Sequence, residues 1–369
     1  MNLNYQTISL SDAAQIIIGD VRGCIAGDYE DTNTYLLVGE PGIGKTSLRT
    51  EIGEALGMKP LLFDAPSSSI EDLLMFIPDR ESHTMRAYLR EDLDITPDRP
   101  VFIVIDEFTK ATPAMQAQLH PLLTAPRRLG SVYLHPHSVV VLTGNLSSDK
   151  VGDRMQGHTA RRIIRLEVQK PTGEEWVNNY ATRRGLHPVV SAFIDRRPEM
   201  FASYRDAGFD AADNPYPYDP KTHGVTGTKC VTPSGMEQVS RECFSYSNGH
   251  INKPQFSRAV EGAIGQHAGA EFAAFFDLAD EIPSPKQIQA DPLNAQISTN
   301  SSAMTIVVMS ALTWAQDHAL LVKWCEYFKR METTHQTTYV LMAQRNEDLF
   351  KKITSVVLAQ RTVAGERNL

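Results

Sequence analysis

The sequence of 369 residues lacks long apolar runs. Its most apolar late stretch, Ala303–Ala315, is shorter than the roughly 20 residues of a membrane-spanning helix, and Gln316 and Asp317 follow it. The first residues do not show the pattern of a signal peptide. We therefore expect a soluble protein of the cytoplasm, without a membrane span.

Cysteines and positive charge are also scarce. The four cysteines are far apart and form no C-x-x-C pair, so the sequence predicts reduced thiols and no disulfide framework or zinc site. The 36 Lys and Arg residues are outnumbered by 44 Asp and Glu residues, which gives a net charge of −8. That balance argues against a protein that coats nucleic acid, although a local basic strip is compatible with it.

The remaining composition, with 42% hydrophobic and 22% charged residues, is that of an ordinary globular protein. Its length is enough for two or three domains. We predict an α/β domain over residues 1–170 and a helical region over residues 171–369. Pro171 interrupts the last strand pattern of the first part, and Thr172 with Glu175 makes the pattern of a capping box.

A glycine-rich turn follows the apolar run Thr34–Val38 and matches the phosphate-binding pattern G-x-x-x-x-G-K-[ST]. Its glycines allow successive N–H groups to form an anion nest, and a helix that starts near Lys45 would point its positive end at the same place. Lys45 is predicted to contact the β- and γ-phosphates, and the Thr46 hydroxyl to contact Mg²⁺. A chance turn is the alternative, which the preceding strand and the following helix disfavour. The predicted nucleotide-binding residues are Gly39, Glu40, Pro41, Gly42, Ile43, Gly44, Lys45, Thr46 and Ser47.

Two acids follow a second apolar run, Val101–Ile105. Five consecutive apolar residues are typical of a strand that is buried on both faces of a parallel sheet. Open α/β sheets bind ligands beyond the carboxyl ends of such strands. We predict that Asp106 holds Mg²⁺ through water and that Glu107 acts as general base on the attacking water. The alternative is a pair of solvated acids at a strand end.

Five apolar runs separated by helices or loops predict a three-layer α/β sandwich, with a parallel five-stranded sheet covered by helices on both faces. Asn145 follows the fourth run and is predicted to orient the attacking water, the alternative being an Asn that caps a turn. The runs are Thr34–Val38, Pro60–Ala65, Val101–Ile105, Ser138–Gly144 and Arg162–Val168.

Between these runs we predict helices over residues 9–25, with Ser11 as N-cap, and over residues 46–57. Residues 67–99 are predicted to form irregular surface insertions, and Leu129–Leu134 a hairpin. The stripe Met115, Leu119, Leu122 and Leu123 is interpreted as core. His135 and His137 could ligate a metal, but we favour a turn because no third ligand is near them in the sequence.

The second half is predicted to be helical over residues 255–278, 304–331 and 339–359, after a long loop over residues 204–230. Trp314, Leu321, Trp324 and Phe328 recur at helical spacing, which is more typical of a core than of a cofactor site.

In its order of motifs the sequence resembles an AAA+ ATPase, with the P-loop followed by Asp106-Glu107, then Asn145, then Arg154 and Arg162. More narrowly, it is similar to the MoxR-like branch. The segments that carry this narrower likeness are Asp106–Gln116, Leu129-Gly130, Glu175–Val177, Gly185–Pro188, Ala192–Ile194, Arg197-Pro198, Thr232-Pro233, Glu281–Pro285 and Ala290–Pro292.

The resemblance implies ATP as the nucleotide and the sensor 1 role for Asn145. It also implies a homo-oligomeric ring, a hexamer, in which Arg154 or Arg162 acts on the nucleotide of the neighbouring subunit. The family usually has a sensor 2 arginine after Thr-Pro in the lid, but this sequence has Ser234 there. A contact between the lid and the γ-phosphate would therefore require Arg241 or another basic residue in its place.

Among function classes, the resemblance favours an ATP-hydrolysing remodeller or chaperone of a protein complex that works with a von Willebrand factor A (VWA) domain partner. A nucleic-acid motor or loader is the first alternative, which the acidic balance disfavours. The second alternative is a slow nucleotide switch that acts as a scaffold. The absent sensor 2 arginine favours this switch, and Glu107 argues against it.

Overall fold

The computed structural model describes residues 6–146 and 157–366. The chain divides into two compact units, with the division between Lys170 and Pro171. Pro220–Thr226 groups with the first unit, although the residues on either side of it belong to the second. Each unit has a core of its own and is described by itself.

The first unit is built on a five-stranded sheet in the order β2-β5-β8-β1-β9, in which every pairing is parallel. This confirms the predicted parallel sheet. The central strands β5, β8 and β1 are almost entirely buried, as the four consecutive apolar residues in each of them predict. The strands are β1 (Thr34–Val38), β2 (Pro60–Asp64), β5 (Phe102–Asp106), β8 (Val139–Gly144) and β9 (Ile164–Glu167).

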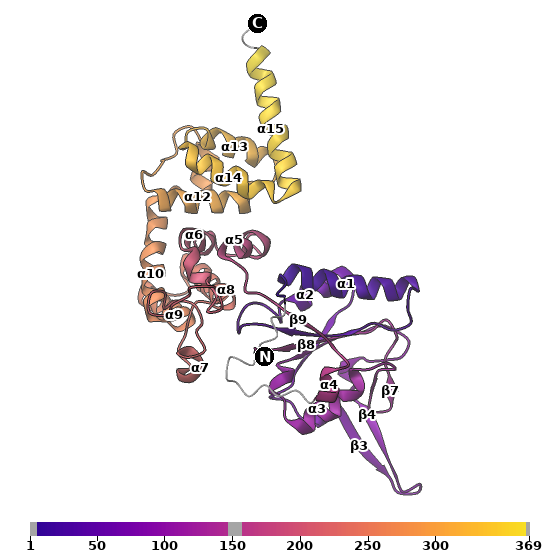
Figure 1. The fold of residues 1–369 in the computed structure, drawn as a ribbon. Coiled ribbons are helices and arrows are strands. Elements are labelled where there is room, and N and C mark those ends of the chain that lie inside the picture. Colours follow the sequence, from indigo (N-terminus) through magenta and orange to yellow (C-terminus); the bar gives the residue numbers. More distant parts are fainter. Residues whose placement is uncertain (1–5, 147–156, 367–369) are drawn as a thin grey trace. The chain divides into compact units, whose positions relative to one another are not determined.

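Helices α1 (Leu10–Ala26) and α2 (Leu48–Leu56) cover one face of the sheet, and α3 (Pro113–Leu119) lies on the other (Figure 1). Successive strand residues point to opposite faces. Tyr35 and Phe102 therefore join the same core cluster as the inward residues of α1 and α2. Burial of each such side chain stabilises the fold by roughly 1.5–3 kcal/mol. The predicted core stripe is confirmed, because Met115 and Leu119 of α3 and Leu122 and Leu123 of the turn after it are all buried.

Two predicted helix starts were wrong. The N-cap of α1 is Ser9, whose side chain accepts a hydrogen bond from the Asp12 backbone N–H, and Ser11 lies within the helix. Helix α2 begins at Leu48 and not at residue 46. Residues 44–50 are instead joined by bonds between residues three apart, such as Ser47 N to Gly44 O (3.0 Å), which is a tighter turn than an α-helix.

The insertion after β2 is more regular than predicted. Strands β3 (Leu74–Asp79) and β4 (Thr84–Leu89) pair as an antiparallel hairpin. The sequence did not reveal it because the hairpin has no alternation of buried and exposed residues, and its apolar side chains Met75, Phe76 and Met85 are exposed. The hairpin that we predicted over Leu129–Leu134 is confirmed as β6 (Arg128–Leu129) and β7 (Val132–Tyr133).

The second unit is helical, as predicted, and the Thr172–Glu175 capping box is confirmed. Each long helical stretch that we predicted is two helices. Gly265, with φ 92°, ends one helix, and Asp317 caps the start of another. Trp324 is fully buried and contacts the Tyr327 and Tyr339 rings, so the predicted core role of this stripe is confirmed.

Residues 177–181 of this unit form a turn of π-helix. Its α-helices are α5 (Gly173–Trp176), α6 (Pro188–Arg196), α8 (Pro233–Ser247), α9 (Lys253–Ile264), α10 (Gln266–Asp277), α11 (Pro285–Ala290), α12 (Ser301–Trp314), α13 (His318–Phe328), α14 (Thr333–Gln344) and α15 (Glu347–Glu366). The predicted long loop contains the short helix α7 (His223–Thr226), and the first unit contains α4 (Gly157–Ala160). Within the described ranges, no helix has the length and apolar character needed to cross a membrane.

Candidate functional site

The carboxyl ends of three neighbouring strands bring the predicted site residues together. Strand β8 lies between β1 and β5, with Val38 opposite Gly144 and Ile105 opposite Leu142. The chain that leaves β1 becomes the P-loop, and β5 ends at Asp106. Polar groups on three sequence segments therefore meet at one edge of the sheet, where open α/β folds bind their ligands.

Lys45 lies folded over the P-loop. Its Nζ donates hydrogen bonds to the backbone oxygens of Gly39 (2.8 Å) and Glu40 (2.7 Å) and to Oδ1 of Asn145 (3.2 Å). The side chain is buried, so these oxygens offset part of the cost of removing its charge from water. A polyphosphate would offer Lys45 stronger, charge-assisted partners at the same place.

Two glycines of the P-loop are required by the backbone. Gly44 has φ 104°, a conformation that residues with a Cβ rarely adopt. At Gly39, a Cβ atom would lie 2.7 Å from the backbone oxygen of Val168, next to β9, and the same distance from the Ile43 side chain. The loop therefore packs directly on the sheet. Ile43 is buried in the core beneath it, so its side chain supports the loop.

Thr46 and Asp106 are adjacent, with a hydrogen bond of 2.9 Å from Thr46 Oγ1 to Asp106 Oδ1. Both residues are partly exposed. A hydroxyl and a carboxylate in contact, open to solvent, are the oxygen ligands that Mg²⁺ takes in nucleotide sites, so these residues fit the predicted metal.

Glu107 begins the turn that follows β5. Its backbone is left-handed, with φ 50° and ψ 35°, which is uncommon for a residue other than glycine. Its backbone N–H donates to Thr143 Oγ1 (3.0 Å), and its carboxylate accepts from Lys110 Nζ (2.7 Å). The second predicted acid is thus held at both its backbone and its side chain.

Asn145 contacts Lys45, so the amide predicted to orient water lies beside the cation predicted to hold phosphate. The predicted arginines are less well defined. Arg154 lies outside the described residues. Arg162 is exposed, and its Nη1 donates to Thr124 Oγ1 (3.2 Å).

Sequence reasoning missed two residues of this site, Thr143 and Lys110. The hydroxyl of Thr143 donates to Asp106 Oδ1 while it accepts from the Glu107 N–H. A signal for Thr143 existed, because it is the one polar residue among the first five of β8. Lys110 had a weaker signal, namely a spacing of three residues after Glu107 that suits an ion pair.

His135 and His137 are in a turn, as favoured, where the His137 backbone N–H donates to Nδ1 of His135 (3.1 Å). Over residues 6–146 and 157–366, no three His, Cys, Asp or Glu side chains gather into a metal-binding group. The four cysteines form no disulfide.

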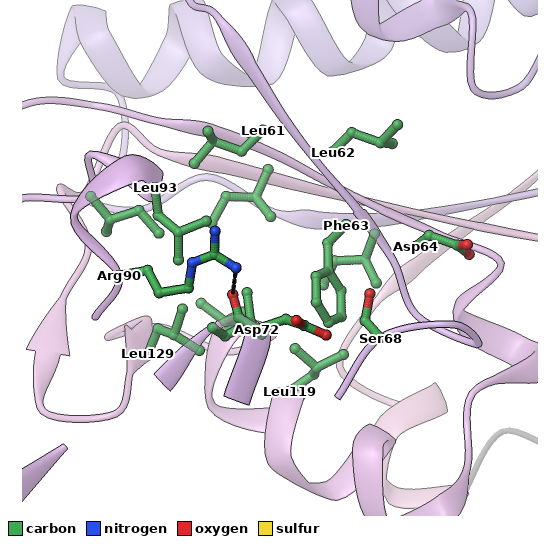
Figure 2. Close-up of a pocket in the computed structure, with 15 residues that line it drawn as sticks. Leu61, Leu62, Phe63, Asp64, Ser68, Asp72, Arg90, Leu93, Leu119 and Leu129 are labelled. Atoms are coloured by element: carbon green, nitrogen blue, oxygen red, sulfur yellow. Dashed lines mark hydrogen bonds between the residues drawn. The ribbon is translucent and has the colours of Figure 1, made fainter. Parts of the chain in front are cut away.

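A separate cavity of about 370 Å³ lies beside the edge strand β2 (Figure 2). Leu and Ile side chains of β2, β5 and the α3 region line it, and Arg90 bonds to the backbone oxygen of Asp72 at its side. Its lining includes no P-loop residue and neither predicted acid. We therefore do not include it in the candidate site.

The geometry agrees with a family comparison. Residues 34–163 match the model of the AAA domain, dynein-related subfamily. This part of the chain has the AAA+ fold. The match covers the P-loop, both acids and Asn145, and it ends within the first unit. A comparison of the whole chain with curated proteins gives no match.

Solved structures similar to this chain include two mutant forms of RuvB from Thermotoga maritima. One is 12% identical, and the comparison covers 82% of this chain and 70% of that chain. The other is 13% identical, with 96% and 89% covered. The TM-score is 0.36 in both cases.

Proposed function

We propose that this protein binds ATP with Mg²⁺ at its P-loop and hydrolyses it to ADP and phosphate. One observation carries the proposal, which is the meeting of Lys45, Thr46, Asp106 and Asn145 at the carboxyl edge of β1, β5 and β8. Phosphoryl transfer needs a cation on the phosphates, oxygen ligands for the metal and a group that orients water, and this edge offers all three.

In this mechanism, Lys45 moves its hydrogen bonds from the loop carbonyls to the β- and γ-phosphates. Thr46 and Asp106 would hold the metal, which when bound would neutralise charge on the phosphates. Glu107 accepts a proton from the attacking water as general base, and the Asn145 amide orients that water. The Lys45–Asn145 contact keeps the water-orienting group near the phosphate-binding cation.

We further propose that the protein acts in the cytoplasm as a homo-oligomeric ring, a hexamer, that remodels a protein complex with a VWA-domain partner. The support is the likeness to MoxR-like ATPases at residues 106–116 and in the second unit. The exposed position of Arg162 is compatible with a role at a subunit interface.

The test separates binding from turnover. Lys45→Ala should weaken ATP binding by about 10-fold or more, whereas Glu107→Gln should bind ATP normally and lose about 100-fold in turnover. Lys59→Ala, a change at an exposed lysine, is the matched control and should leave both unchanged. Fluorescent-nucleotide titration and phosphate release measure the two quantities. Undiminished turnover in Lys45→Ala would overturn the proposal.

A slow nucleotide switch is the second candidate, because Ser234 stands where a sensor 2 arginine is expected. Arg241, the basic residue named above as a substitute, is ion-paired with Glu237 (2.6 Å). This candidate predicts tight ATP binding with turnover slower than about one per minute, below the usual range for enzymes.

The partner can be captured with the same Glu107→Gln variant, because a subunit that binds ATP without turnover should retain its client. Affinity purification with ATP should recover a protein partner that Lys45→Ala does not recover. Recovery of nucleic acid would instead favour the motor or loader.

A further inference from the structure

We infer that Thr143 is a positioning residue that sets the geometry of both acids of this site. The inference rests on the proposed function, because it concerns the acids that would hold the metal and activate water. It adds to the site a residue of β8, whereas the acids themselves follow β5.

The placement of Thr143 follows from the strand register. Ile105 of β5 lies opposite Leu142 of β8, so the next residues, Asp106 and Thr143, are side by side at the end of the sheet. The Thr143 hydroxyl donates its proton to Asp106 Oδ1, and its oxygen accepts the N–H of Glu107 at 3.0 Å. A hydroxyl has one donor and two acceptor sites, so it can make both bonds at once.

These two bonds constrain different properties of the acids. At Asp106, Oδ1 also accepts from Thr46, so hydroxyls from β8 and from the P-loop fix the carboxylate plane from two directions. At Glu107, the bond fixes the backbone N–H of a residue in the left-handed conformation. Such a conformation persists only where the surroundings determine it, and Thr143 is one of the groups that do so.

The hydroxyl is not needed for the fold of β8. The strand pairs through its backbone on both sides, and four apolar residues precede Thr143 in it. Thr143 is 1% exposed, so a valine of nearly the same shape would preserve the packing. We therefore assign the Thr143 hydroxyl the role of orienting the two acids.

The end of β8 is also fixed against the turn that follows Glu107. A Cβ atom at Gly144 would lie 2.7 Å from the side chain of Thr109, so the strand and the turn are in close contact. This contact limits how far Thr143 can move relative to Glu107, so it also limits the movement of the Thr143 hydroxyl relative to the two acids.

The experiment compares Thr143→Val, which removes the hydroxyl, with Thr143→Ser, which keeps it. In Thr143→Val we expect kcat to fall about 10- to 100-fold, as for groups that orient metal ligands. The gain in ATP affinity on adding Mg²⁺ should shrink by a similar factor, while Mg²⁺-free affinity stays within about threefold of the parent. Thr143→Ser should restore both quantities to within about threefold, because its hydroxyl can reach both acids.

The matched control is Thr305→Val, which also removes a buried hydroxyl, one that bonds to Ser301 O in the other unit. It should leave kcat and the Mg²⁺ effect unchanged. If Thr143→Val does not fold, Thr143→Ala offers the same loss without the added methyl.

Parent-like values of kcat and of the Mg²⁺ effect in Thr143→Val would overturn the inference, as would equal losses in Thr143→Ser. These outcomes are distinct from failure of the proposed function. That failure would appear in the unmodified protein as nucleotide affinity that does not respond to Mg²⁺ and as no turnover, whereas failure of the inference leaves the unmodified protein active.

Discussion

The ammonium of Lys110 lies 2.7 Å from Oε1 of Glu107, three residues earlier in the same turn. The Lys110 side chain is 25% exposed and that of Glu107 is 42% exposed, so water screens the pair. Such pairs contribute at most about 1 kcal/mol to stability. The effect of this pair on function is of a different kind, because it restricts the direction in which the proposed general base points.

Lys110→Met should therefore change turnover more than stability. The methionine keeps the aliphatic length and removes the charge, so the Glu107 carboxylate samples more orientations. We expect kcat to fall about 3- to 10-fold, since a positioned base contributes roughly 10²–10⁴-fold and only part of its orientation is lost. The melting temperature should change by less than about 3 °C. Phosphate release and thermal unfolding measure the two effects. Faster turnover would mean instead that Lys110 restrains Glu107 from reaching the water.

Two glycine-to-alanine changes should have opposite effects on stability. In Gly39→Ala the new methyl would approach the Val168 backbone oxygen to 2.7 Å, and the free energy of unfolding should fall by about 1–3 kcal/mol. Gly19→Ala is the matched change at an exposed position in the middle of α1, where a Cβ atom would meet nothing within 4 Å. It should raise the free energy of unfolding by about 0.5–1 kcal/mol. Urea unfolding compares them, and equal losses would contradict the role assigned to the sheet contact at Gly39.

The sequence was sufficient to predict the parallel sheet, because β1, β5 and β8 each contain four consecutive apolar residues. It also placed the P-loop and the acids at the carboxyl ends of their strands, since strand, turn and polar residue follow one another directly in the chain. Local patterns therefore predicted both the sheet and the edge at which the site lies.

The contacts that could not be predicted from the sequence join residues that are distant in the chain. Thr143 reaches Asp106 across 37 residues, through the pairing of β5 with β8. The contact of Lys45 with Asn145 spans 100 residues. The β3–β4 hairpin was missed for another reason, because exposed apolar residues such as Met75 break the alternation by which strands are recognised.

His187 should make the stability of the second unit depend on pH. Burial among the Phe244 and Phe276 rings lowers its pKa to about 4, from an ordinary value of 6.5. The folded state then keeps His187 neutral between these two pH values, while the unfolded state binds a proton. Stability is therefore complete above about pH 6.5 and decreases as the pH falls towards 4, by at most about 3 kcal/mol.

The measurement uses tryptophan fluorescence, because Trp176, Trp314 and Trp324 all lie in the second unit. Urea unfolding between pH 4 and 7 should show a shallower pH dependence in His187→Gln than in the parent. His250→Gln, at an exposed histidine, should keep the slope of the parent. The comparison is of slopes, because His187 also caps α6 and its loss lowers stability at every pH. Equal slopes in all three proteins would contradict the prediction.

A last prediction concerns the proposed ring and its arginines. If Arg162 acts on the nucleotide of the neighbouring subunit, Arg162→Ala should bind ATP normally and lose turnover by about 10³-fold or more. An arginine acting in trans makes the site a joint product of two subunits, one contributing Glu107 and the other contributing Arg162. Inactive variants of the two residues should then complement each other when mixed.

In an equal mixture of Glu107→Gln and Arg162→Ala subunits, random assembly gives about one quarter of the interfaces an intact Glu107 facing an intact Arg162. Turnover should therefore return to about one quarter of the parent value, and to somewhat less if neighbouring sites must act together. The same mixture made with Arg154→Ala decides whether that arginine has the role instead. Complementation by neither arginine, in mixtures that assemble, would refute action in trans, because a site contained within one subunit cannot be repaired by a neighbour that carries a different defect.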